Sequence, residues 1–175
     1  MPDIYGPKER SRIMSLIRST GNRPERRLYE IARSVLGWRW RIDRNVRSLP
    51  GRPDLLIPAL RLAIFADGCF YHCCPKHWRP PKSNSSYWMP KLRRNTARDR
   101  ANESALRRRG FSVWRVWEHD LRVSRAKSTY FRLRRRFQSK GVRTNLSSAQ
   151  LLLMPRRKSS EVNGAARVPR DPYDE

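Results

Sequence analysis

Residues 60–78, LRLAIFADGCFYHCCPKHW, decide how the rest of the chain is organised. The apolar run from Leu60 to Phe65 predicts a strand buried on both faces, and hence a central strand covered by helices. It leads directly into a segment that holds all three cysteines of the protein and two of its three histidines: Cys69, Cys73, Cys74, His72 and His77. This density of soft ligands predicts a metal-binding loop at the end of a core strand.

The charge of the chain predicts a polyanionic partner. Its 175 residues include 40 Lys and Arg against 15 Asp and Glu, a formal net charge of +25. Residues 138–175 contribute only +3 of this, so the basic part is residues 1–137. Nucleic acid is the first expectation, although a basic structural RNA-binding protein would share this composition. The clustered cysteines predict a reducing, intracellular environment. No apolar run approaches the roughly 18 residues of a membrane span, so a soluble protein with no membrane partner is expected.

Apolar spacing predicts four helices around the central strand. A short basic helix is expected at 8–19. A second helix has Asn22 as its N-cap, Glu25 at the capping-box position and Gly37 at its end. Two further helices are expected at about 87–109 and at 121–137, the last one strongly basic.

Strands are predicted at 38–42, where Trp38, Trp40 and Ile42 alternate with arginines, and at 54–57, 60–65 and 111–117. The order helix, helix, strand, strand, strand, helix, strand, helix predicts an α/β domain over residues 1–137, with a mixed central sheet flanked by helices. Residues 138–175, rich in Ser, Arg and Pro, are expected to form a mostly disordered tail.

The ligand spacing predicts a structural zinc ion. Cys69, Cys74 and His77 read C-x4-C-x2-H, and His119 after the last strand would complete a Cys2His2 set. Cys73 is an alternative to Cys74, and His119 has the plainer interpretation of an exposed residue at a strand end. Four candidate ligands leave no open position, which disfavours a catalytic zinc.

A second constellation consists of carboxylates at strand ends. If the strands pair as a hairpin about Ala59 and Leu60, Asp54 lies opposite Phe65 and Ala66. Asp54, the main-chain carbonyl of Ala66 and Asp67 are then close enough to hold Mg2+, which would activate a water for attack on a phosphodiester. The plainer interpretation is that both carboxylates form turns.

Two other side chains have alternative roles on spacing alone. His72 lies between the zinc ligands without being needed by them, so it is either a general base beside the metal-bound water or a spare zinc ligand. Glu25 is explained by helix capping.

Eight strings in order, from residue 8 to about residue 122, carry a resemblance to a known family: RSRIM (10–14), PERRL (24–28), LPGRPD (49–54), FADGCFYH (65–72), PKSN (81–84), YW (87–88), NTARDR (95–100) and VWEH (116–119). In combination they resemble the very-short-patch repair (Vsr) mismatch endonucleases, of the PD-(D/E)xK nuclease superfamily. The resemblance implies a restriction-endonuclease-like fold, with residues 1–20 forming a DNA-contacting N-terminal helix. Residues 123–175 are not covered.

The activity that the resemblance implies is Mg2+-dependent nicking of duplex DNA 5′ to the thymine of a T·G mismatch left by deamination of 5-methylcytosine. The alternative is a zinc-stapled DNA-binding protein without catalysis. A monomer in the bacterial cytoplasm, associated with the nucleoid, is expected, with a functional link to a cytosine-5 DNA methyltransferase.

The resemblance also assigns roles to single residues. Asp54 and the Ala66 carbonyl match the Mg2+ contacts, His72 the general base and Glu25 a supporting glutamate. Two further sets match family residues. The structural zinc ligands are matched by Cys69, Cys74, His77 and His119. The DNA-intercalating residues are matched by Phe70, Tyr71, Trp88 and Met14.

The chain departs from the family pattern at three places. Tyr71 replaces the usual tryptophan. Asp67 stands where members have either His or Asp, so its catalytic part is open. Cys73 is an additional thiol.

Overall fold

The structure, a computed structural model, describes Arg12 and residues 21–144. Apart from Arg12, the predicted helix at 8–19, with Met14, lies outside the described residues, as does the part of the predicted tail from residue 145.

A four-stranded mixed sheet forms the centre of the described fold. Its strands lie side by side in chain order: β1 (Asp43–Arg44), β2 (Leu55–Ile57), β3 (Leu62–Asp67) and β4 (Ser112–Trp117). β2 pairs antiparallel with both β1 and β3, whereas β3 and β4 are parallel. The mixed α/β architecture predicted from the order of elements is therefore confirmed.

The hairpin of β2 and β3 has the predicted register. Leu55 pairs with Ile64, so Asp54, one residue earlier, lies beside Phe65 and Ala66. The sequence predicted a strand from Leu60, but Pro58–Leu60 forms a 3-10 turn. β3 begins at Leu62, after Arg61 reverses the chain with a positive φ of 44°.

Helix α2 (Arg23–Leu36) begins at the predicted capping box. The Glu25 amide donates to Asn22 Oδ1 at 3.0 Å, and the Glu25 carboxylate accepts from the Gly21 amide at 2.7 Å. The helix ends at Gly37, whose φ of 73° is strained for residues with a Cβ.

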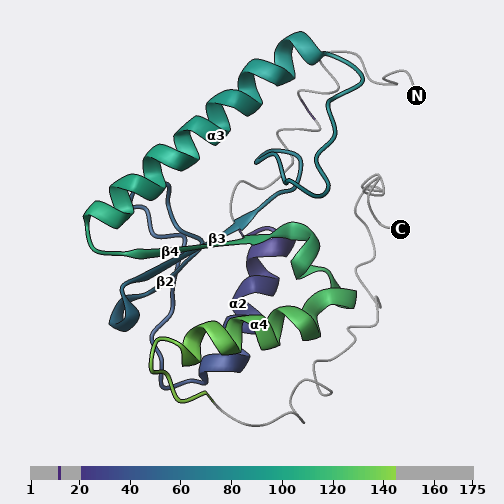
Figure 1. Ribbon diagram of the computed structural model, residues 1–175. Coiled ribbons are helices and arrows are strands. Elements are labelled where there is room, and N and C mark those ends of the chain that lie inside the picture. Colours follow the sequence, from purple (N-terminus) through teal and green to yellow (C-terminus); the bar gives the residue numbers. More distant parts are fainter. Residues whose placement is uncertain (1–11, 13–20, 145–175) are drawn as a thin grey trace.

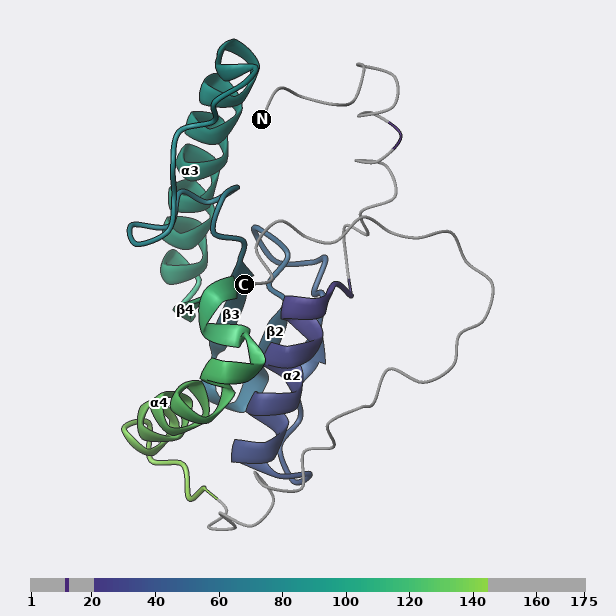
Figure 2. The same ribbon diagram turned by 90° about the vertical axis from the view of Figure 1, so that its right-hand side faces the viewer.

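The helices cover both faces of the sheet. Helix α3 (Ser85–Arg108) lies on one face, and α2 and α4 (Ala126–Gln138) lie on the other (Figures 1 and 2). Parallel strands need a crossover, and the long segment from β3 through α3 to β4 supplies it. Apolar clusters on the two faces fix these layers: Leu28, Ile31, Ile64, Leu133 and Phe137 on the α2–α4 side; Leu56, Ala63, Phe65 and Leu106 on the α3 side.

The strand predicted at 38–42 is wrong. Trp38 is 85% exposed, and only Asp43–Arg44 pairs with β2. The cause is Arg33, whose Nη1 donates to the carbonyls of Gly37 and Trp40 at 2.9 and 2.7 Å and holds the chain in a bend. Its guanidinium also stacks 5.0 Å from the Trp38 ring, so the exposed indole packs on the helix rather than in the core.

The predicted last helix starts later than expected. Two 3-10 turns, η2 (Glu118–Leu121) and η3 (Val123–Arg125), precede α4. Val142 is only 4% exposed and packs in the core, so the described fold continues past Phe137. Among the described residues, no helix combines the length and apolarity needed to cross a membrane.

Candidate active site

Asp54 is placed at the edge of the sheet where β3 ends. Its Oδ2 accepts a 2.7 Å hydrogen bond from the Ala66 amide. Burial raises the pKa of Asp54 to about 7; the Ala66 hydrogen bond opposes this rise, and the charges of Glu25 and Asp67 add to it. Carboxyl groups from α2, from the residue before β2 and from β3 therefore act on one another, an arrangement that a divalent cation would stabilise.

Glu25 lies at the predicted helix cap and also acts on Asp54 of the candidate metal site. It is 5% exposed, and its two carboxylate oxygens accept hydrogen bonds of 2.7 Å from the Gly21 amide and the Asn22 side chain. Its charge also acts on Asp54. The N-cap of α2 thus fixes a carboxylate beside the candidate metal position.

His72 is held by an aspartate that sequence reasoning missed. His72 Nδ1 lies 2.6 Å from Asp99 Oδ2, and Asp99 comes from α3. Burial alone would raise the pKa of Asp99, but the hydrogen bond and charge of His72, with Arg115, lower it below its usual value. If Nδ1–H donates to an ionised Asp99, His72 Nε2 is the ring nitrogen left to accept a hydrogen bond. The available signal was the NTARDR string, which contains Asp99.

Asp67 forms an ion pair with a second residue that the sequence did not single out. Arg115 donates from Nε and Nη2 to the two Asp67 oxygens at 2.5 and 2.8 Å. Asp67 is 2% exposed. No local motif marks Arg115, because its partner lies 48 residues away on the neighbouring parallel strand.

The four predicted zinc ligands meet in space. The ligand atoms of Cys69, Cys74, His77 and His119 all lie within 4.8 Å of one another. Cys69 Sγ is 3.2 Å from His119 Nδ1, and Cys74 Sγ is 3.7 Å from the Nδ1 atoms of His77 and His119. Two thiols and two imidazoles within this distance fit the donor set of a tetrahedral structural zinc.

Cys73 lies outside this group of ligand atoms. Its φ of 54° marks a tight reversal between Cys69 and Cys74. Glu118 supports the same loop by accepting a 3.1 Å hydrogen bond from the Cys69 amide.

The predicted intercalating aromatics form one cluster. Phe70 lies edge-on to Tyr71 and Trp88, with ring centroids 5.4 and 5.1 Å away, and the Tyr71 and Trp88 centroids are 6.1 Å apart. The Asn95 side chain donates to the Tyr71 carbonyl at 3.2 Å, fastening the loop to α3. Met14 lies outside the described residues.

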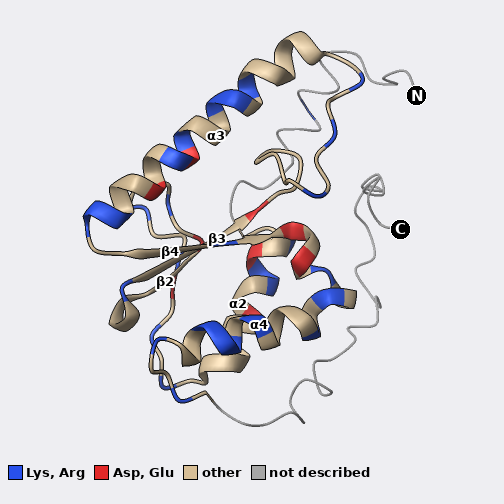
Figure 3. Ribbon diagram, in the orientation of Figure 1, with Lys and Arg blue, Asp and Glu red and all other residues tan. Residues whose placement is uncertain are grey.

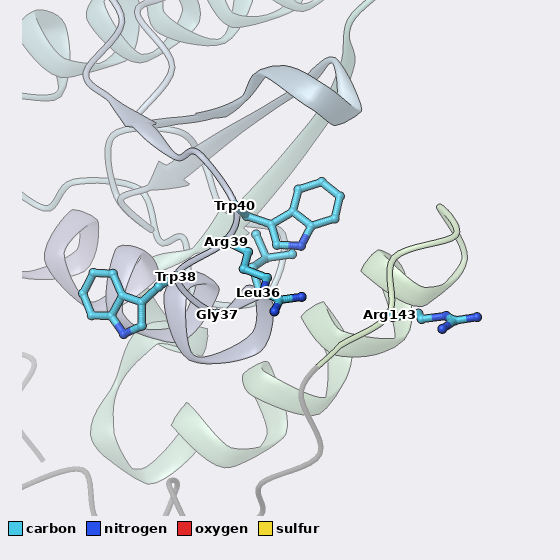
Figure 4. Close-up of a pocket in the computed structure, with 6 residues that line it drawn as sticks. All are labelled: Leu36, Gly37, Trp38, Arg39, Trp40 and Arg143. Atoms are coloured by element: carbon cyan, nitrogen blue, oxygen red, sulfur yellow. The ribbon is translucent and has the colours of Figure 1, made fainter.

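A hollow at the other end of α2 is separate from these groups. It is lined by Leu36, Gly37, Trp38, Arg39, Trp40 and Arg143 (Figure 4). Eleven residues of helix separate Leu36 from Glu25, about 17 Å at 1.5 Å per residue. The hollow therefore contributes nothing to the carboxylate site.

Basic side chains are spread over the helices outside the carboxylate region. Figure 3 shows Lys and Arg along α3 and α4, with acidic residues near the end of β3 and in the turns that follow β4. Basic residues on the helices can bind a polyanion over a wide area. The acidic residues near β3 can hold a cation that contacts the polyanion at one point.

Similarity to known proteins identifies the family of the chain. Residues 2–79 match the family described as DNA mismatch endonuclease Vsr. The type II nicking enzyme V.NaeI of Lentzea aerocolonigenes is 46% identical over 114 residues, 63% of this chain and 68% of that protein. V.XorIIP of Xanthomonas oryzae pv. oryzae is 39% identical over 124 residues (69% and 88%). The DNA mismatch endonuclease Vsr of Escherichia coli is 33% identical over 123 residues (70% and 77%).

These matches define the class of the molecule as a DNA endonuclease, a hydrolase that acts on DNA. The chain belongs to the Vsr family, as the resemblance of its motifs predicts.

Proposed function

We propose that the protein is a mismatch endonuclease that nicks one strand of duplex DNA 5′ to the thymine of a T·G mismatch arising from 5-methylcytosine deamination. The observation that carries the proposal is the meeting of Asp54 with the His72–Asp99 pair beside an aromatic cluster. Relatives named as nicking enzymes support cleavage of a single strand.

Asp54 and the main-chain carbonyl of Ala66 would hold Mg2+ at the end of β3. Bound there, the ion would lower the pKa of a water and neutralise charge developing on the phosphate. Glu25, fixed in its cap, adds negative charge that favours a cation at Asp54.

His72 is the general base of the proposed reaction. Its Nε2 accepts a proton from the attacking water while Nδ1–H stays bound to Asp99. The water oxygen forms a bond to phosphorus as the bond to the leaving sugar oxygen breaks, and that oxygen takes a proton from solvent. Asp99 orients the ring and stabilises the imidazolium that forms.

The rings of Phe70, Tyr71 and Trp88 would enter the duplex beside the mismatch, and Met14, in the helix expected at 8–19, would contact the same site. Separating stacked bases costs a few kcal/mol, less where a mismatch already weakens the stack. Deformability therefore contributes to the choice of T·G over paired bases.

Zinc at Cys69, Cys74, His77 and His119 has a mechanical role in this proposal. Phe70, Tyr71 and His72 lie between two of the ligands in sequence, so closing the metal site fixes the loop that carries them. A rigid loop enters DNA without a large loss of conformational entropy. The enzyme would act as a monomer, and a companion cytosine-5 methyltransferase would produce the 5-methylcytosine whose deamination gives the T·G substrate.

A nicking assay tests the proposal directly. End-labelled duplexes with one T·G, T·A or C·G pair at the same position are incubated with Mg2+ or with a chelator. We expect cleavage only of the thymine strand of the T·G duplex, only with Mg2+, and none by Asp54→Ala or His72→Ala. Tight binding to the T·G duplex without nicking would favour the non-catalytic alternative, and full activity of either variant would refute the assignment of the site.

A further inference from the structure

Arg115 lies between two carboxylates near His72, the buried Asp67 and the partly buried Asp99. It comes from β4, beside Phe65 of β3, and its guanidinium stacks 5.2 Å from the Phe65 ring. Both oxygens of Asp67 accept from it. Its Nη2 also lies 3.3 Å from Asp99 Oδ2, the oxygen that contacts His72 Nδ1.

His72 Nδ1 therefore has one carboxylate at hydrogen-bond distance and a second carboxylate nearby. Asp99 Oδ2 is 2.6 Å from Nδ1, and Asp67 Oδ1 is 3.9 Å from it. A small rotation of the ring would exchange one carboxylate for the other and turn Nε2 away from its present direction. The bidentate pair with Arg115 engages both Asp67 oxygens at 2.5 and 2.8 Å, whereas Arg115 contacts Asp99 only at 3.3 Å, which leaves Asp99 as the stronger acceptor.

The ion pair with Arg115 limits the ability of Asp67 to bind a metal ion. An almost fully buried carboxylate with both oxygens bound to a guanidinium has little freedom to coordinate a metal. Asp54 differs, because among the described residues its carboxylate accepts one hydrogen bond, from the Ala66 amide to Oδ2. Asp54 and Asp67 thus differ in how free their carboxylates are to bind a metal ion.

We propose that Arg115 is a positioning residue for His72: by clamping Asp67 it leaves Asp99 as the sole acceptor for Nδ1, and Asp67 acts as part of this clamp rather than as a ligand of the catalytic metal. The proposal rests on the proposed function of His72 as the general base. It assigns Asp67 a role that the sequence left open.

The charges of Asp67 and Arg115 determine which variants test the proposal. Removing Arg115 alone leaves Asp67 buried without a partner, which destabilises the fold and gives His72 a competing acceptor. Replacing Asp67 by Asn at the same time removes that charge. The double variant should therefore be more active than Arg115→Met alone, which is a coupling that independent residues would not show.

The experiment uses the full chain with Asp67→Asn, Arg115→Lys, Arg115→Met, and Asp67→Asn with Arg115→Met. Arg107→Met is the control, because Arg107 is an exposed residue of α3 paired with Glu103. Single-turnover nicking and affinity for the T·G duplex are measured separately. We expect Arg115→Met to slow nicking about 100-fold with affinity changed less than about threefold, the double variant to recover roughly tenfold, and Arg115→Lys to lie between Arg115→Met and wild type.

A second measurement does not depend on activity. The chain has three histidines, so nitrogen-15 spectra of the imidazoles can report the tautomer of His72. The clamp predicts one hydrogen-bonded Nδ1–H tautomer in the wild type and in Arg107→Met, and a mixture in Arg115→Met. An unchanged His72 signal in a folded Arg115→Met protein would refute the clamp.

Two further outcomes would overturn the proposal. Loss of DNA affinity as large as the loss of rate in Arg115→Met would make Arg115 a phosphate contact. A tenfold or greater rise in the Mg2+ requirement of Asp67→Asn would make Asp67 a metal ligand. If the wild type nicks no mismatched duplex, the proposed function fails, while the His72 spectra still decide whether the clamp exists.

Discussion

The Ala66 amide donates a 2.7 Å hydrogen bond to the Asp54 carboxylate, tying the residue before β2 to the end of β3. One hydrogen bond across the hairpin therefore places the candidate metal ligand beside the backbone carbonyl expected to share the ion. The antiparallel register of β2 and β3 makes this contact possible. Any shift of that register would move Asp54 away from Ala66.

Asp54→Asn should abolish nicking without unfolding the protein. The amide keeps an oxygen that can accept from Ala66 but loses the charge that holds the cation, so a fall in rate of about 1,000-fold or more is expected. Thermal unfolding without metal at pH 8 should not become easier, because a buried charge has been removed. Asp43→Asn, in the edge strand β1, where Asp43 is partly exposed and paired with Arg41, is the matched control and should keep its activity.

Mg2+ binding should be linked to proton release near neutral pH. The pKa of Asp54 is raised to about 7, so the metal-free carboxyl is mostly protonated below that pH and must ionise to bind the ion. Affinity should therefore increase from about pH 6 to pH 8. Calorimetric titration in buffers of different ionisation enthalpy would measure the protons released, and Asp54→Asn should release none from this site.

The same pKa fixes the sign of a stability effect. Because the folded-state pKa of Asp54 is above its ordinary value of 3.8, its contribution favours folding below that value and is lost as pH rises through about 7. Without metal, the free energy of unfolding of Asp54→Asn should thus exceed that of the wild type more at pH 8 than at pH 5. An equal difference at both pH values would contradict the raised pKa.

The neighbouring thiols Cys69 and Cys73 provide a matched test of zinc. Cys69→Ser should lose bound zinc and lower the melting temperature by about 5 °C or more, because structural zinc contributes directly to folding. Cys73→Ser should keep both, since its sulfur lies outside the ligand cluster. Metal analysis and circular dichroism melts measure the two quantities, and zinc loss in Cys73→Ser would instead make that thiol a ligand.

Trp88→Ala should weaken binding to mismatched DNA more than binding to matched DNA. The indole is part of the Phe70–Tyr71–Trp88 cluster, and stacking on a base contributes about 1–3 kcal/mol. Trp38→Ala is the control, because Trp38 is 85% exposed at the far end of α2. Fluorescence of 2-aminopurine beside the mismatch reports unstacking, and equal effects of the two substitutions would argue against a wedge.

Local sequence signals predicted much of the fold. The capping box at Asn22 and Glu25 and the hairpin of β2 and β3 appear in the structure because each depends on residues close together in the chain. The strand predicted at 38–42 is wrong because alternation was the only signal, and the bonds from Arg33 to Gly37 and Trp40 overrule it. Alternation indicates a strand only where a partner edge is available.

The sequence by itself determined the family, and it predicted the four Cys and His residues that cluster in the structure and most residues of the proposed site, since short-range motifs carry ligand chemistry. Only the tertiary structure decided which groups hold these residues in place. Asp99 reaches His72 across 27 positions, and Arg115 reaches Asp67 across 48. Such pairs form because α3 packs on the sheet and β4 lies parallel to β3, so their spacing follows the topology and leaves no periodic signal in the chain.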